Sequence, residues 1–245
     1  MKAYLLAAGF ATRMYPLTRD VAKPLLEVGG EPILSHILGR IETIPDLSEV
    51  VVVGNHRFAE SLKQWSLTLS CPFPIRILDD GANEVEERLG ALGDLAFALE
   101  QVPNGEEDLL VVAGDNLLDF DLAPYYEAFL AEASSLLITR RVELKGGPSP
   151  YNEIELDEEG CIRSFREKPA DPISSLSAMA VYFLTAESRL LLQDYLGAGG
   201  NPDAPGHFIA WLVSRRRVAT RPLSGRWFDI GSLESLQDAR EAFSS

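Results

Sequence analysis

Three short apolar runs constrain the fold of this chain more than any other feature. They are Lys2–Leu6, the β-branched run Val50–Gly54 and Asp108–Ala113. Apolar runs of this length, ended by glycine or polar residues, are typical of strands buried on both faces. Helical periodicity separates them, most clearly at Ile33–Ile41. Strands that alternate with helices through residue 133 predict βαβ units, and therefore an α/β fold whose mostly parallel sheet carries helices on both faces.

The second half of the chain has a different pattern, which begins near Ser134. The expected elements are strands at 136–139 and 177–184, a hairpin at 152–167, and helices near 186–196 and 205–213. No linker separates the halves. We therefore expect a single domain over residues 1–245, with an α/β half at 1–133 and a β-rich half at 134–245.

Composition excludes several classes of function. The hydrophobic share of 46% and charged share of 24% are those of a soluble globular protein. No apolar run reaches the roughly 18 residues of a membrane span, and the N-terminal pattern is not that of a signal peptide. Two cysteines, Cys71 and Cys161, form no disulfide or metal-binding pattern, so we expect a cytoplasmic protein. The net charge of −15 argues against a nucleic-acid partner.

The loop after the first strand has the composition of an anion site. Ala7-Ala8-Gly9 lacks large side chains, so its backbone N–H groups can approach a ligand closely. Arg13, Arg19 and Lys23 follow it. Small residues and clustered cations at a strand end suit a polyphosphate. The alternative is a tight strand-to-helix turn with a solvated basic rim.

Two further segments are expected beside this loop. The acidic loop 79–88 and Gly114-Asp115-Asn116 also follow predicted parallel strands, whose carboxyl ends meet at one edge of a sheet. Asp115 and Asp229 are candidate ligands for Mg²⁺, which takes few protein oxygens. Asp229 is expected in a compact turn over Arg226–Ser232, which is aromatic and bounded by glycine. The alternative for each is to cap a following helix.

The hairpin ends in Glu167-Lys168-Pro169, which offers a second charged group. If this end faces the cleft, Lys168 can neutralise a phosphate and Glu167 can accept hydrogen bonds from sugar hydroxyls. The alternative is an exposed charge pair before a proline.

Taken together, these motifs resemble a known family. Leu6–Thr18, read as L-A-A-G-x-A-T-R-x-x-P-L-T, and Lys23-Pro24-Leu25 are similar to the signature loop of the sugar-1-phosphate nucleotidylyltransferases. Gly114–Asn116, Gly160–Pro169 and Trp227–Ser232 follow in the family's order. The resemblance implies a three-layer Rossmann-like fold with a nucleotide-binding half at 1–133 and a sugar-phosphate-binding half at 134–245. It also implies transfer of a nucleotidyl group from a nucleoside triphosphate to a sugar 1-phosphate, with Mg²⁺ as cofactor.

The resemblance also implies the roles of individual residues. The expected nucleotide-binding residues are Leu6, Ala7, Ala8, Gly9, Thr12, Arg13, Lys23, Arg88, Gly90 and Gly114. The expected catalytic residues are Arg13, Lys23 and Asp115; the metal ligands are Asp115 and Asp229; and the sugar-phosphate ligands are Asn152, Glu167 and Lys168. The sugar phosphate attacks the α-phosphorus in line, and no histidine base is needed because the attacking phosphate is already ionised.

Departures from the family pattern leave the substrates open. Ala11 stands where glycine is frequent, as do Asn152 and Ala180. The segment 83–94 lacks the glutamine and Pro-Gly pattern with which thymidylyl and uridylyl members read the base. Two other functions remain: a cytidylyltransferase for a small phosphorylated alcohol such as phosphocholine, and a non-catalytic sugar-nucleotide sensor subunit. We expect no membrane partner, and the oligomeric state is open.

Overall fold

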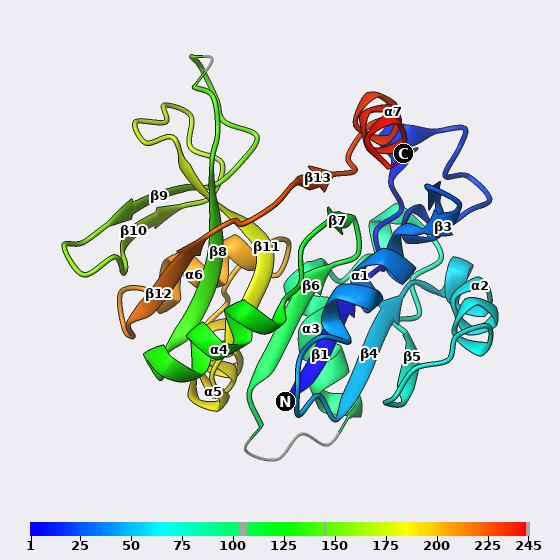
Figure 1. Ribbon diagram of the computed structural model, residues 1–245, viewed down its shortest axis with the longest axis horizontal. Helices are drawn as coiled ribbons and strands as arrows, with labels where there is room; N and C mark the ends of the chain where they lie inside the picture. Colours follow the sequence, from blue (N-terminus) through cyan, green and yellow to red (C-terminus); the bar gives the residue numbers. More distant parts are fainter. Residues whose placement is uncertain (103–106, 145, 244–245) are drawn as a thin grey trace.

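The computed structural model describes residues 1–102, 107–144 and 146–243 (Figure 1). Within these ranges the central sheet has seven strands, in the order β12-β8-β11-β6-β1-β4-β5. The strands are β1 (Lys2–Leu6), β4 (Glu49–Gly54), β5 (Ile75–Asp79), β6 (Leu109–Ala113), β8 (Ser135–Arg141), β11 (Leu176–Leu184) and β12 (Val218–Pro222). Strand β11 runs antiparallel to β6 and β8, whereas the other neighbouring strands pair in parallel. The expected mostly parallel sheet is confirmed.

Helices cover both faces of this sheet. They are α1 (Ile33–Ile41), α2 (His56–Leu67), α3 (Ala91–Gln101), α4 (Ala123–Glu132), α5 (Ala186–Gly197), α6 (Pro205–Leu212) and α7 (Leu233–Ala242). Buried residues of α1, α2, α4 and α7 share one apolar cluster, and those of α3, α5 and α6 share another. Along β1, Ala3 and Leu5 belong to the first cluster, and Tyr4 and Leu6 to the second. Side chains that alternate in this way produce the expected three layers.

Three small antiparallel strand pairs lie outside the main sheet. They are β2 (Glu27–Val28) with β3 (Glu31–Pro32), β7 (Asn116–Leu118) with β13 (Trp227–Asp229), and β9 (Glu153–Leu156) with β10 (Ile162–Arg166). The β9–β10 pair is the hairpin that the sequence predicts. The segment around Asp229, expected as a turn, is instead strand β13, because Trp227–Asp229 pairs with Leu118–Asn116.

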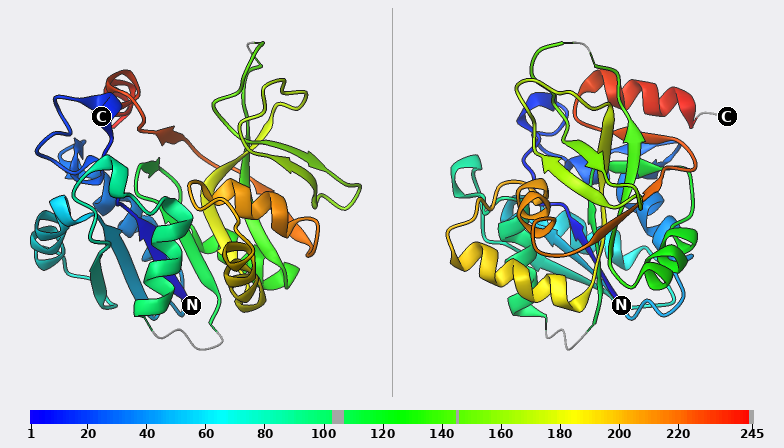
Figure 2. Two further views of the ribbon diagram at one scale, coloured as in Figure 1. Left: turned by 180° about the vertical axis from the view of Figure 1, so that it is seen from behind. Right: turned by 90° about the vertical axis from the view of Figure 1, so that its left-hand side faces the viewer.

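The C-terminal segment returns to the first half of the chain. Strand β13 crosses from β12 toward β7, and α7 then lies near β2 and β3 (Figures 1 and 2). Arg240 Nε donates to the carbonyl of Glu27 at 3.0 Å, and the Phe243 ring contacts His36 edge-on at 5.2 Å. This return places Asp229 beside the end of β6. No helix in the described part of the chain is long and apolar enough to cross a bilayer.

Candidate active site

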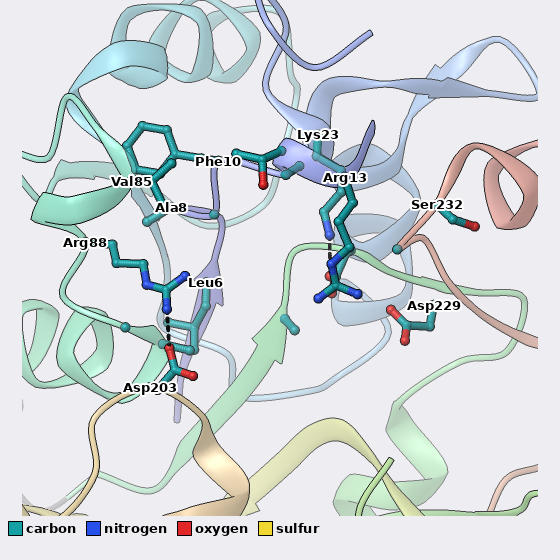
Figure 3. A pocket seen from close by; sticks show the side chains of 18 of the residues that line it. Leu6, Ala8, Phe10, Arg13, Lys23, Val85, Arg88, Asp203, Asp229 and Ser232 are labelled. Carbon is teal, nitrogen blue, oxygen red and sulfur yellow. Dashed lines mark hydrogen bonds and ion pairs between the residues drawn. The ribbon is translucent and has the colours of Figure 1, made fainter. Parts of the chain in front are cut away.

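A cleft of about 910 Å³ opens at the carboxyl ends of β1 and β6 (Figure 3). Its walls come from both halves of the chain, namely the loop after β1, the acidic loop after β5, the end of β6, and segments near 150, 168, 203 and 229. The predicted site residues that line it are Leu6, Ala8, Gly9, Thr12, Arg13, Lys23, Arg88, Gly90, Asp115, Lys168 and Asp229. Four predicted site residues, Ala7, Gly114, Asn152 and Glu167, are not among its lining.

Close packing of strand ends forms the floor of the cleft. The N–H of Gly114 donates to the carbonyl of Leu6 at 2.8 Å, and a Cβ on Gly114 would lie 2.9 Å from that oxygen. The N–H of Ala7 donates to the carbonyl of Val53 at 2.8 Å. Ala7 and Gly114 therefore act from beneath the cleft, because they let the ends of β1, β4 and β6 lie close together.

The loop after β1 is anchored from inside and carries its cations outward. Asn55 Nδ2 donates to the carbonyl of Ala8 at 2.9 Å, and Met14 is fully buried. Ala11 has φ 49°, a left-handed conformation that favours glycine, which explains why glycine suits this position. Arg13 is exposed in the turn that follows and makes no hydrogen bond or ion pair with the residues that the structure describes. Its guanidinium is therefore available to a ligand.

Lys23 and Asp115 form an ion pair at this end of the cleft. The Lys23 Nζ to Asp115 Oδ2 distance is 2.6 Å, and the side chains are 14% and 28% exposed. Lys23 is held in a short 3-10 turn over residues 23–25, and Asp115 follows β6 after Gly114. A predicted phosphate ligand and a predicted metal ligand thus lie in direct contact.

Asp229 is brought to Asp115 by the pairing of β7 with β13. The N–H of Ile230 donates to the carbonyl of Asp115 at 3.1 Å, and Trp227 Nε1 donates to Asn116 Oδ1 at 2.8 Å. Burial raises the pKa of Asp229, and the negative charge of Asp115 raises it further. Ser232, not an aspartate, caps α7, so the capping alternative does not hold for Asp229.

The two carboxylates fit a hard divalent cation. Both are oxygen donors, and the effect of Asp115 on the pKa of Asp229 reports that their charges repel each other. No cluster of three or more histidine, cysteine or acidic side chains with metal-binding geometry occurs among the described residues. Two carboxylates suit Mg²⁺, which keeps several waters and is completed by substrate phosphates.

The opposite end of the cleft joins the acidic loop to the second half of the chain. Arg88 Nη2 lies 3.3 Å from Asp203 Oδ1 (Figure 3). The N–H groups of Ala91 and Leu92, at the start of α3, donate to the carbonyls of Asp203 and Pro202 at 3.0 and 2.9 Å. The missing side chain of Gly90 makes room for this contact, because a Cβ there would lie 2.6 Å from the Pro202 oxygen.

The predicted sugar-phosphate residues are placed differently from one another. Lys168 is exposed, has φ 44° and lines the cleft. Burial raises the pKa of Glu167, whose carboxylate lies against Gly206 at the start of α6. The Asn152 amide is engaged with β11: its Oδ1 accepts from the N–H of Ala178 at 2.7 Å and its Nδ2 donates to the Ala178 carbonyl at 3.0 Å.

Sequence reasoning missed Asp94, which lines the cleft, and Arg140, which packs against the cleft residue Tyr151. Arg140, on β8, lies between the rings of Tyr151 and Trp227, 4.3 and 4.0 Å from their centroids, and burial lowers its pKa while Asp229 opposes that effect. Nothing in its local pattern distinguishes it from a strand-end arginine. Asp94 lines the cleft although it is almost fully buried. Its signal was present: an acidic residue stands on the apolar face of a predicted helix.

This fold and site define a nucleotidyl transferase. Residues 2–245 match the model of the nucleotidyl transferase family, to which the chain belongs. It is 28% identical over 235 residues to the mannose-1-phosphate guanylyltransferase catalytic subunit beta of Drosophila pseudoobscura pseudoobscura, covering 94% of this chain and 59% of that protein. It is 26% identical over 243 residues to the UTP–glucose-1-phosphate uridylyltransferase of a Synechocystis species, covering 95% of this chain and 61% of that protein. The chain thus spans about three-fifths of the length of these relatives.

Solved structures share the architecture. A UDP-glucose pyrophosphorylase bound to UDP-glucose superposes with a TM-score of 0.81 at 20% identity, covering 99% of this chain and 97% of that one. A UTP-bound enzyme of the same kind from Acinetobacter baumannii gives 0.76 at 18% identity, covering 99% and 92%. These superpositions confirm the fold. The resemblance to the sugar-1-phosphate nucleotidylyltransferases is confirmed by the family match and by the curated relatives.

Proposed function

We propose that this protein transfers a nucleotidyl group from a nucleoside triphosphate to a sugar 1-phosphate and releases pyrophosphate. The observation that carries the proposal is the meeting of Arg13, Lys23, Asp115 and Asp229 at one end of a cleft. Cations and paired carboxylates from segments far apart in sequence converge there. The sugar-1-phosphate enzymes among the relatives support the same reaction class.

The chain's own residues supply position and charge. Arg13, which has no partner among the described residues, and Lys23 bind the triphosphate. Lys168 neutralises the acceptor phosphate, which enters from the second half. The ionised acceptor oxygen attacks the α-phosphorus in line, and fixed cations stabilise the charge that moves to the pyrophosphate.

Asp115 and Asp229 are the residues that would hold Mg²⁺. When bound, the ion screens the repulsion between the two anionic substrates and stabilises the developing charge. Lys23 is the partner of Asp115 in this structure. A metal–triphosphate would offer each of these two side chains a new partner of opposite charge.

The reaction is tested with a matrix of nucleoside triphosphates against sugar 1-phosphates and phosphocholine, each with Mg²⁺. Pyrophosphate release and product mass are the readouts. We expect turnover with at least one sugar 1-phosphate. Turnover with phosphocholine but with no sugar 1-phosphate would show that the acceptor is a phosphorylated alcohol. Nucleotide binding without pyrophosphate release from any substrate pair would favour a non-catalytic sensor.

Asp115→Asn should lower kcat/KM by about a hundredfold or more, because a neutral amide is a poor ligand for Mg²⁺. Asp121→Asn is the matched control, since that carboxylate is 54% exposed and pairs with Arg40 outside the cleft. Both variants should unfold at nearly the wild-type temperature. Near-normal turnover by Asp115→Asn would remove this residue from the metal site.

A further inference from the structure

Arg140 is a half-buried cation that forms no ion pair with the described residues. It lies near the end of β8, between the rings of Tyr151 and Trp227, whose centroids are 4.3 and 4.0 Å from its Cζ. Its Nε and Nη2 atoms are sealed from solvent and have no hydrogen-bond partner among the described residues. Burial lowers the pKa of this guanidinium, because a cation that has lost water is less stable. The fold therefore holds Arg140 at a cost in stability.

Packing alone does not explain an arginine at this position. A buried N–H group without an acceptor costs free energy, and an apolar side chain of similar size would fill the same space without that cost. The two aromatic faces attract the guanidinium and return part of the cost. Side chains that lower stability but are needed for activity are typical of active sites. The residues on either side of Arg140 indicate what its role is.

The two rings that enclose Arg140 belong to different parts of the site. Tyr151 lines the cleft and comes from the second half of the chain. Trp227 begins β13, two residues before Asp229, and its Nε1 donates to Asn116 Oδ1 at 2.8 Å. Strand β13 has three residues and pairs with β7, which also has three, so few ladder bonds hold it in place. Arg140 therefore connects a wall of the cleft to the strand that carries Asp229.

The charge of Arg140 acts on the same strand. Burial and the charge of Asp115 raise the pKa of Asp229, whereas the charges of Lys23, Arg140 and Arg13 lower it. Lys23 is already paired with Asp115, and Arg13 is exposed. Arg140 therefore offsets part of the repulsion between Asp115 and Asp229 from a position that the two rings fix.

We infer that Arg140 is a positioning residue, which holds Tyr151 and the Asp229 strand in a fixed relation by lying between the rings of Tyr151 and Trp227. Arg140 itself is not part of the cleft lining, so it acts through these residues. The inference rests on the proposed function, in which Asp229 is a metal ligand. An in-line transfer needs both substrates aligned, and a displacement of about 1 Å can lower the rate by about a hundredfold.

Arg140→Leu removes the cation and leaves an apolar side chain between the rings. It should unfold no more than about 3 °C below the wild type, because the unpaired N–H groups are lost together with the cation–π contacts. Hydrogen exchange of residues 226–232 should become at least about threefold faster, while exchange of β1 and β4 stays unchanged. With the best substrate pair, kcat should fall about tenfold or more. The KM for the nucleoside triphosphate should stay within about twofold, because Arg13 and Lys23 are untouched.

A conservative variant and a neighbouring arginine complete the experiment. Arg140→Lys should retain at least about a third of the wild-type kcat and slow exchange of residues 226–232, because an ammonium group also binds aromatic faces. Arg141→Leu is the matched control. Arg141 is exposed on the same strand, donates from Nη1 to Ser175 Oγ at 3.1 Å and is not part of the cleft lining. This variant should behave as the wild type does in unfolding, exchange and turnover.

Several results would overturn the inference. One is wild-type kcat in Arg140→Leu, and another is unchanged exchange of residues 226–232 in that variant. A third is an Arg140→Lys variant as impaired as Arg140→Leu. A large fall in unfolding temperature, with faster exchange throughout the chain, would show that Arg140 is a structural residue. If Arg140→Leu does not fold, Arg140→Met replaces it in every measurement, and failure of both variants to fold would likewise show a structural residue.

Turnover separates this inference from the proposed function. If the wild type releases no pyrophosphate with any substrate pair, the proposed function fails. Faster exchange of residues 226–232 in a stable Arg140→Leu variant would then still support Arg140 as the residue that fixes β13. Wild-type turnover that Arg140→Leu matches would leave the proposed function standing and overturn the role of Arg140.

Discussion

Charged residues in and beside the cleft are stabilised in different ways. Lys23 and Asp115 neutralise each other at 2.6 Å, and burial together with the charge of Asp80 raises the pKa of Asp94. Arg140 lies between two aromatic faces, which attract a cation. A chain with a net charge of −15 can hold an anion site because several of its cations, Arg13, Lys23, Arg88 and Lys168, line one cleft.

The Asp80–Asp94 pair predicts a pH-dependent gain in stability from Asp94→Asn. The pKa of Asp94 is raised from 3.8 to about 7 in the folded protein. Below pH 3.8 the Asp94 carboxyl is mostly protonated in both the folded and the unfolded protein, so its raised pKa does not change the free energy of unfolding. As the pH rises toward the folded pKa, the unfolded chain ionises first, so the free energy of unfolding falls, by at most about 1.4 kcal/mol per pH unit.

Asparagine carries no such proton, so Asp94→Asn should stabilise the protein more at pH 7 than at pH 4.5. Urea unfolding of both proteins from pH 4.5 to 8 measures this difference. A difference that stays constant over the range would show that Asp94 does not titrate with a raised pKa.

The structural elements differ in how far the sequence determines them. Strands β4 and β6 lie within one residue of their expected bounds, because strands buried on both faces are continuous apolar runs. Helix α2 begins at His56, because Asn55 caps it by accepting from the N–H of Phe58. Strands β7 and β13 could not be predicted, since each has three residues and its partner lies more than a hundred residues away.

The site residues also differ in this way: those set by local motifs could be predicted, and those set by distant contacts could not. Motifs on the loops after β1 and β6 identified Arg13, Lys23 and Asp115 as cleft residues, because the carboxyl ends of parallel strands meet at one edge. Asp94 becomes a cleft residue, and Arg140 the neighbour of one, only through tertiary packing. Asn152 was predicted to contact the sugar phosphate, but its amide bonds the backbone of β11, a contact that depends on register.

Two glycines that precede α3, Gly81 and Gly90, have nearly equal φ values but should respond differently to substitution by alanine. Gly90 has φ 82° and Gly81 has φ 86°. A Cβ at Gly81 meets open space, so Gly81→Ala should destabilise by about 1–2 kcal/mol through backbone strain alone. A Cβ at Gly90 would lie within 3 Å of Pro202 and Asp203 backbone atoms, so Gly90→Ala should destabilise by a further 1–3 kcal/mol, roughly. Chemical denaturation measures the free energy of unfolding of both variants. Equal losses would mean that the backbone of residues 202–203 moves away from the new Cβ without a cost in stability.

At the scale of the whole molecule, the two predicted halves share one sheet and both of its apolar clusters. Strand β11 joins β6 of the first half to β8 of the second. One apolar cluster contains Leu110, Ile138 and Phe183, together with Leu236 of α7. The C-terminal segment then crosses back over β7 and brings Asp229 to the first half. The active cleft therefore exists only when both halves are folded against each other.

This continuity predicts that the two halves unfold in one cooperative transition, and the three tryptophans allow the test. Trp65, on α2, reports the first half, and Trp211, on α6, reports the second. Two variants, each with Trp227→Phe and one further Trp→Phe, keep a single reporter. In each variant the fluorescence midpoint in urea should coincide with the midpoint from circular dichroism, which reports the whole chain. Comparison within one variant removes the effect of the substitutions on stability. A Trp211 transition at lower urea than the circular dichroism transition would instead show that the second half unfolds separately, as an independent domain would.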